Sequence, residues 1–237
     1  MKLKIPDKIF GEPIEGAMER RFPKDNSTNP IIDPVIVPDT NSKNIDGYIY
    51  IPSINLYVSK ERILQGNNWY NAHKELLKNN QQMLTIPQFI EFLKYTKTNN
   101  PEIYNDIIEV RDPWRAEWLD ADFKVKNKKL YINYNHILDS KGNLIPKNLE
   151  LLENCLMEDK TPGIDLESWL NNSIKQGLPK KDVNSGSLYY YCPMKDNNSV
   201  VGFVAGSGGA SLDCSGNPHD ASVALGVRPA KIFEGVK

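Results

Sequence analysis

The chain has 237 residues, of which 40% are hydrophobic and 25% are charged. This balance is typical of an ordinary globular protein with a real core, built as one decorated domain or two small ones. The formal net charge of −1 excludes a general electrostatic attraction to nucleic acid or to an anionic membrane, so we expect neither as a partner.

The first residues, "MKLKIPDKIFGEPIEG", contain no apolar segment of the kind found in secretory signals. No stretch approaches the ~20 apolar residues of a membrane span. We therefore expect synthesis in the cytoplasm without membrane insertion, and display by assembly into a virus particle or by another surface route. Cys155, Cys192 and Cys214 are odd in number and far apart, which favours reduced, partly buried thiols over a disulfide framework, although a single bridge stays open.

Residues 1–46 are rich in Pro, Asn and Asp, with five prolines between Pro6 and Pro34 and another at Pro38. Each proline fixes φ and removes a backbone donor, so neither a helix nor a central strand fits. The segment is interpreted as an extended arm or linker that lies on the main domain or reaches a neighbouring subunit. The remaining residues, 47–237, form the second predicted unit.

Strand formers follow in Tyr48–Val58. Apolar residues at helical spacing then predict a helix in 67–80, with His73 near its surface, and another in 85–99 with Thr85 as N-cap. A third helix covers 101–110.

Residues 111–137 predict a turn, a Trp-rich segment and two strands, Phe123–Val125 and Leu130–Tyr134. Two helical pieces follow in 148–160 and 165–177, and then a short strand in 187–193. Three terminal strands are expected near Val200–Ala205, Ser211–Cys214 and Ala224–Ala230. Strands at both ends with helices between them indicate an α+β domain, in which we expect the first strand to lie close to the terminal one.

The segment from Glu109 to Asp122 is dense in carboxylates, which could serve hydrolysis or hold Ca²⁺. Arg111 and Arg115 lie among these acids, with two tryptophans beside them. We therefore expect a salt-bridged framework around buried Trp114 and Trp118.

The histidines, His73, His136 and His219, are isolated from one another in the sequence. Cys214 and His219 form no recognisable nucleophilic pair, because nothing marks a third residue that orients the base. The "GSGG" at 206–209 lacks the Lys-Ser/Thr ending of a phosphate loop. The sequence therefore predicts no catalytic residue, no metal ligand and no cofactor.

Residues 196–230 have an unusual composition. Lys, Glu, Gln, Met and Trp make up 51 of the 237 residues, yet none occurs in these 35. Those five are residues that a codon ending in C or T cannot encode. Every residue from Gly202 to Val223 could arise by changing the adenines of an Asn codon, although a Gly/Ser-rich surface loop is the plainer explanation.

With this composition, "GFVAGSGGASLDCSGNPHDASVALGVRPA" resembles the variable region of diversity-generating retroelement variable proteins, a substitutable stretch closed by an "LGVR" strand. "RDPWRAEWLDADF" and the helices before it are similar to archaeal and archaeal-virus members. The resemblance covers roughly residues 48–230. Formylglycine-generating enzymes and other C-type-lectin-like domains end in a similar motif.

The resemblance implies a C-type lectin fold, like that of formylglycine-generating enzymes, whose terminal strands display substitutable side chains on a rigid scaffold. It implies ligand binding and no enzymatic activity. The partner would be an unknown protein or glycan on a host or neighbouring cell. The cysteine pair of formylglycine-generating enzymes has no counterpart in this chain.

Within a variable region of about 196–230, the expected ligand-binding face consists of residues that lie outward or in loops. These are Phe203, Gly206, Gly208, Gly209, Asp213, Ser215, Gly216, Asn217, His219, Asp220, Ala221 and Val223. Alternation in "SLDCS" and "ALGVRPA" assigns the scaffold to another set. That set is Leu212, Cys214, Leu225, Gly226 and Val227.

Two alternatives stay open. One is an enzyme on a related C-type-lectin-like fold, with the acidic segment or Cys214 as its site. The other is a structural virion protein without a hypervariable surface.

Overall fold

The structure is a computed structural model that describes residues 8–9, 12–13 and 45–232. The chain divides into two compact units, 1–39 and 40–237. In the first unit, β1 (Lys8–Ile9) pairs antiparallel with β2 (Glu12–Pro13). Most of the expected N-terminal arm lies outside the described residues.

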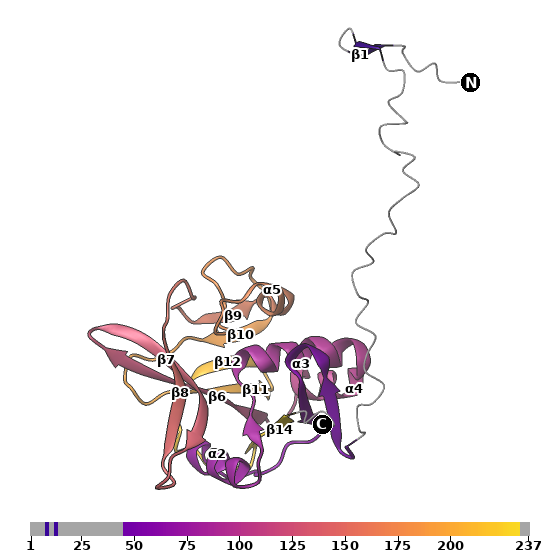
Figure 1. Ribbon diagram of the computed structural model, residues 1–237. Coiled ribbons are helices and arrows are strands. Elements are labelled where there is room, and N and C mark those ends of the chain that lie inside the picture. Colours follow the sequence, from indigo (N-terminus) through magenta and orange to yellow (C-terminus); the bar gives the residue numbers. More distant parts are fainter. Residues whose placement is uncertain (1–7, 10–11, 14–44, 233–237) are drawn as a thin grey trace, which may run out of the picture. The chain divides into compact units, whose positions relative to one another are not determined.

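The second unit is mixed α+β and contains an eight-stranded and a four-stranded sheet (Figure 1). In the larger sheet the strand order is β8-β7-β6-β11-β12-β10-β9, and β13 pairs with β6 off this path. The strands of this sheet are β6 (Arg115–Lys126), β7 (Lys129–Leu138), β8 (Leu144–Leu151), β9 (Lys160–Ile164), β10 (Leu188–Tyr191), β11 (Val200–Gly206), β12 (Gly209–Gly216) and β13 (Leu225–Gly226).

The smaller sheet brings together the two ends of this unit. It has the order β3-β4-β14-β5, with β3 (Tyr48–Ile51), β4 (Leu56–Ser59), β5 (Gln82–Met83) and β14 (Pro229–Ile232). A 3₁₀ turn, η1 (Pro52–Ile54), joins β3 to β4. Ala230 pairs with Val58, so the expected proximity of the first and terminal strands is confirmed.

Three of the four helices in the described residues begin at a residue whose side chain caps the helix. The four helices are α2 (Trp69–Lys78), α3 (Ile86–Asn99), α4 (Pro101–Ile108) and α5 (Leu166–Asn172). Thr85 and Gln88 form a reciprocal capping box at α3, as the Thr85 prediction requires. No helix within the described residues is long and apolar enough to span a membrane.

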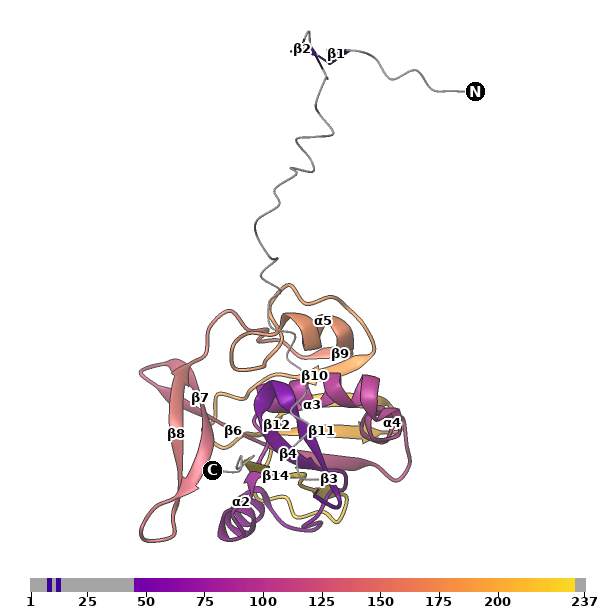
Figure 2. The ribbon, with the colours of Figure 1, turned by 45° about the vertical axis from the view of Figure 1, so that its right-hand side comes forward.

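Two clusters of buried side chains hold the layers together. In the larger one, α3, α4 and α5 pack on one face of the eight-stranded sheet, where Phe89 and Trp169 approach Phe203 (Figure 2). In the smaller one, Trp69 and Leu76 of α2 pack with Trp118, Leu225 and Val227. The sheet is therefore covered by helices on one face and by α2 over part of the other.

Two expected elements differ from the structure. The helix expected in 148–160 is wrong, because 144–151 forms β8, which pairs with β7 from Leu138↔Leu144 to Tyr131↔Leu151. The two strands expected in 123–134 are longer, since β6 extends back to Arg115 and β7 runs on to Leu138.

The expectation of two buried tryptophans is half right. Trp118 is 3% exposed, whereas Trp114 is 40% exposed and lies just before β6. Arg111 pairs with Asp106 at 2.9 Å, and Arg115 pairs with Glu117, so the salt-bridged framework is confirmed. The three cysteines are free thiols.

Candidate functional site

The antiparallel hairpin of β11 and β12 carries most of the expected ligand-binding residues. Its register runs from Gly206↔Gly209 at the turn to Val200↔Gly216 at the open end. Val201, Phe203, Leu212 and Cys214 belong to the larger cluster, and each is at most 1% exposed. Because side chains alternate along a strand, the residues between them point to the opposite side.

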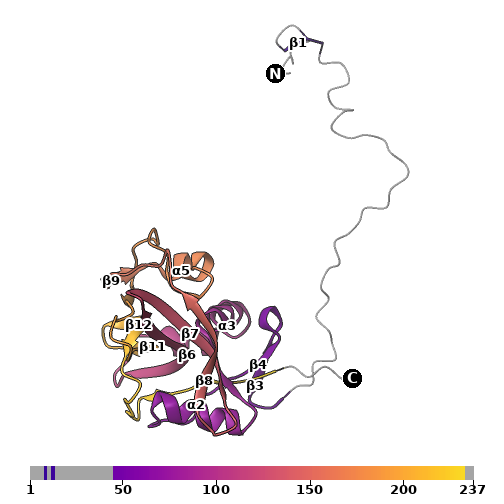
Figure 3. The ribbon, with the colours of Figure 1, turned by 60° about the vertical axis from the view of Figure 1, so that its left-hand side comes forward.

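We call this opposite side the hairpin face. It comprises Val204, Gly206, Ser211, Asp213 and Ser215, together with the loop 217–223. Ser211 is buried beside Val204 and Tyr189, with which it pairs, whereas the other four strand residues are partly exposed. In Figure 3, β11 and β12 lie at the boundary of the folded unit, on the side away from α3.

The structure places most of the predicted residues at or near this face. Gly206, Gly208 and Gly209 lie at the hairpin turn, and Asp213, Ser215 and Gly216 lie along β12. Asn217, His219, Asp220, Ala221 and Val223 are exposed in the loop that follows. The scaffold residues Leu212, Cys214, Leu225, Gly226 and Val227 are all buried, as expected.

Phe203 is the exception, and its assignment to the face is wrong. The side chain is 1% exposed, with ring centroids 5.1 Å from Phe89 and 6.2 Å from Trp169. Outward positions on β11 belong instead to Val204 and Gly206. Phe203 is a scaffold residue that anchors the hairpin to the helices.

Two of the predicted glycines are poor positions for substitution. Gly209 has φ +126°, a conformation that side chains other than glycine rarely adopt. A Cβ on Gly216 would lie 3.1 Å from the Val200 carbonyl oxygen and 3.3 Å from Trp118 Cζ3. At both positions the backbone conformation or the packing therefore favours glycine.

The loop 217–223 is exposed but tethered. It runs from the end of β12, beside Val200, back to Ala116 of β6, which pairs with Leu225. Buried Pro218 accepts a hydrogen bond from the Trp69 amide at 3.1 Å. The Asn217 and Asp220 side chains accept from the amides two residues on, each at 3.0 Å. The loop therefore has a defined shape, while Asn217, His219, Asp220, Ala221 and Val223 are exposed.

Three aromatic side chains beside the hairpin were missed by the sequence analysis. Tyr189 and Tyr191 are partly exposed on β10 and pair with Ser211 and Asp213, which puts them on the same side of the sheet. Trp114 lies next to Gly206, where an added Cβ would be 3.5 Å from Trp114 Cβ. A short strand was expected in 187–193, but nothing in the sequence indicated that β10 lies parallel to β12.

Arg228, the last residue of "LGVR", connects the terminal segment to the large sheet. Its guanidinium donates to Glu117 at 2.7 and 3.0 Å and to the Ser59 carbonyl at 3.0 Å. Burial by itself raises the pKa of Glu117, but Arg228 and Arg115 outweigh it and lower the pKa to about 2. Glu117 is therefore an ionised structural group. Around it, the acidic segment forms the expected salt-bridged framework.

A second polar cluster consists of His73, Asp120 and His136, which were expected to be unrelated. His136 Nδ1 lies 2.5 Å and His73 Nε2 lies 3.5 Å from Asp120 Oδ1. His73 is 1% exposed, so its expected surface position is wrong. The helical spacing Trp69, Ala72, His73, Leu76 is the signal that could have placed it inward.

The two histidines of this cluster titrate differently. Burial lowers the pKa of His73 to about 4, so it is neutral near pH 7. Burial also opposes the charge of His136, but hydrogen bonds to Asp120 and Asp122 outweigh it and raise the pKa to about 9. His136 is therefore held as an imidazolium between two carboxylates.

Comparison of the chain with protein-family models, curated proteins and solved structures finds no match.

Proposed function

We propose that the chain is a ligand-binding variable protein, whose hairpin face is diversified by a retroelement on a C-type-lectin-like scaffold. The ligand is a protein or glycan on a host or neighbouring cell. Binding at this face involves no catalytic step. Assembly into a virion or another surface structure would bring the face to its ligand.

The observation that carries this proposal is the division of one short segment into two sets of residues. Within 203–223, Phe203, Leu212 and Cys214 are fixed by the main cluster, while Asp213, Ser215 and the loop residues touch solvent. Changes at exposed positions usually alter stability by less than ~0.5 kcal/mol. Such a segment tolerates diversification at its surface without loss of the fold.

The neighbouring aromatic residues favour a binding role for the same surface. Tyr189, Tyr191 and Trp114 border the hairpin face, next to Ser211, Asp213 and Gly206 respectively. Tyr and Trp dominate the binding energy of many interfaces, and their position outside 196–230 makes them constant anchors beside a variable centre. The combination suits a broad protein or glycan surface.

The C-type lectin assignment is part of the proposal. It is supported by the pairing of β14 with β4, which joins the two ends of the unit, and by the hairpin of β11 and β12 near the end of the chain. The "LGVR" segment crosses between the sheets, since Leu225 pairs with Ala116 while Val227 bridges to Ile63.

Sequencing the gene and its flanks in independent isolates tests the function. We expect a reverse-transcriptase gene beside a near-copy of the segment that encodes 196–230, with differences confined to adenines. Substitutions between isolates should concentrate at Asp213, Ser215 and the loop 217–223, and should spare Phe203. Equal variation along the chain, with no such near-copy, would favour a structural virion protein without a hypervariable surface.

A further inference from the structure

The cluster of His73, Asp120 and His136 offers one nitrogen or oxygen donor from each side chain, all within 4.8 Å of one another. All three residues are buried, and His73 Nε2 has no hydrogen-bond partner. An unpartnered nitrogen in the interior is costly unless something binds it. The atom opposite it, at 3.5 Å, is the Asp120 oxygen that also meets His136.

The surrounding elements hold these donors rigidly. His73 projects from the buried stripe of α2, next to Trp69 at 4.3 Å between ring centroids. The other oxygen of Asp120 accepts from the His136 amide at 3.1 Å. Asn135 has φ +56°, which interrupts the regular alternation of β7 and directs the next side chain, His136, toward Asp120.

We propose that His73 Nε2, Asp120 Oδ1 and His136 Nδ1 bind a divalent transition-metal ion of the zinc class. Two imidazoles and one carboxylate are a common donor set for such ions, and a fourth position is left for water. Zinc bonds of 2.0–2.1 Å put neighbouring ligand atoms about 3.3 Å apart. The His73–Asp120 separation of 3.5 Å is close to that spacing, whereas the 2.5 Å between His136 Nδ1 and Asp120 Oδ1 widens when the ion replaces the proton between them.

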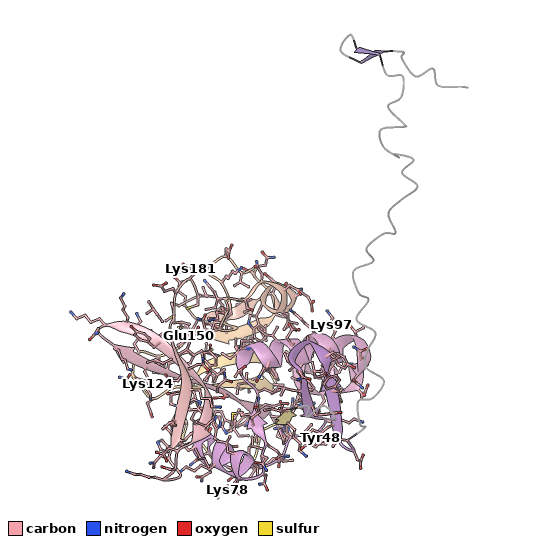
Figure 4. All side chains as sticks on the ribbon, in the orientation of Figure 1. Tyr48, Lys78, Lys97, Lys124, Glu150 and Lys181 are labelled. Carbon is pink, nitrogen blue, oxygen red and sulfur yellow. The ribbon has the colours of Figure 1, made fainter. Side chains whose placement is uncertain are left out.

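Asp122 does not bind the ion but contacts the other ring nitrogen of His136. Its Oδ1 lies 3.2 Å from His136 Nε2, and its Oδ2 accepts from Asn133 at 3.2 Å and pairs with Lys124 at 3.1 Å (Lys124 is labelled in Figure 4). A carboxylate on the far nitrogen of a metal-bound histidine fixes its tautomer and orientation.

The centre extends beyond the proposed binding function, since none of its ligands lies on the hairpin face. It joins α2 to β6 and β7, and the first residue of α2 donates to Pro218 in the loop 217–223. A bound ion would therefore stabilise the elements that support the loop 217–223, without contacting the protein or glycan bound at the hairpin face.

The test is a zinc titration of the full chain after chelator treatment and dialysis, in competition with a chromogenic chelator. We expect one zinc per chain and a higher melting temperature with zinc, while Ca²⁺ and Mg²⁺ have no such effect. His73→Leu should weaken zinc binding by more than ~100-fold, and Asp122→Asn by about 10–100-fold. His219→Gln and Cys192→Ser, which change groups outside the cluster, should bind as the unaltered protein does.

Lack of stoichiometric zinc binding by the unaltered chain would overturn the proposal, whether or not the variants fold. Zinc binding that survives in folded His73→Leu, or is lost in His219→Gln or Cys192→Ser, would also overturn it. Because gene sequencing tests the variable face independently, failure of the metal centre leaves the proposed binding function standing.

Discussion

Glu117 illustrates how a single residue links the middle of the chain to its end. It is 1% exposed and pairs with Arg115 from its own strand and with Arg228 from the terminal segment. Arg228 also packs over the Phe92 ring, at 5.3 Å from the centroid. A carboxylate in this position remains charged because two guanidiniums offset the loss of water.

Replacing Glu117 with Gln leaves two buried or nearly buried guanidiniums without their carboxylate. We expect the free energy of unfolding at pH 7 to fall by about 3–5 kcal/mol. Denaturant unfolding measures this, with the exposed Glu61→Gln as a control that should change it by less than ~0.5 kcal/mol. A loss for Glu117→Gln no larger than that of the control would contradict the structural role.

The same residue predicts a pH dependence. The folded-state pKa of Glu117 is lowered to about 2 from an ordinary value of 4.5, so its contribution is complete above pH 4.5. The contribution is lost as the pH falls from 4.5 through about 2, because the unfolded chain takes up the proton first. Over this range, folded Glu117→Gln should lose less unfolding free energy than the unaltered protein.

At the scale of elements, the helices were the best predicted part of the fold. Thr85 accepts a hydrogen bond from the Gln88 amide as predicted, and Asn68 caps α2 in the same way by accepting from the Asn71 amide. The helix expected in 148–160 was wrong. The helix propensity of Leu and Glu is only a weak preference, and the pairing of β8 with β7 outweighs it.

The hairpin shows why the candidate site was only partly predictable. In β12, Leu212 and Cys214 alternate with Asp213 and Ser215, which fixes the side to which each points. In β11, "VVGFVAG" is apolar throughout, although Val204 and Gly206 are partly exposed, so it carries no alternation. Phe203 was therefore assigned to the wrong side.

The orientation of β11 can be tested with one pair of substitutions. Phe203→Ala should lower the free energy of unfolding by about 3–5 kcal/mol, since a buried aromatic side chain is removed. Val223→Ala, at a side chain that is 83% exposed, should change it by less than ~0.5 kcal/mol. Thermal or denaturant unfolding gives both values, and comparable losses for the two would contradict the assigned orientation.

At the scale of the folded unit, 45–232, the terminal segment supplies both the scaffold and the surface. β11 and β12 lie inside the large sheet, and β14 lies inside the small one. Between them, the loop 217–223 returns beside α2. The sequence predicted that the two ends meet, but it did not predict the cluster of His73, Asp120 and His136, whose members come from three separate elements.

The central claim is that the hairpin face can vary while the scaffold stays folded. Thermal denaturation of two randomised libraries tests it most directly. The face library varies Asp213, Ser215, His219, Asp220, Ala221 and Val223. The matched scaffold library varies Val201, Phe203, Leu212, Cys214, Leu225 and Val227.

We expect most members of the face library to melt cooperatively, with a median shift below about 10 °C from the parent. Most members of the scaffold library should fail to fold. If the face library unfolds as often as the scaffold library, its side chains hold the fold together, and the hairpin face is not a substitutable binding surface.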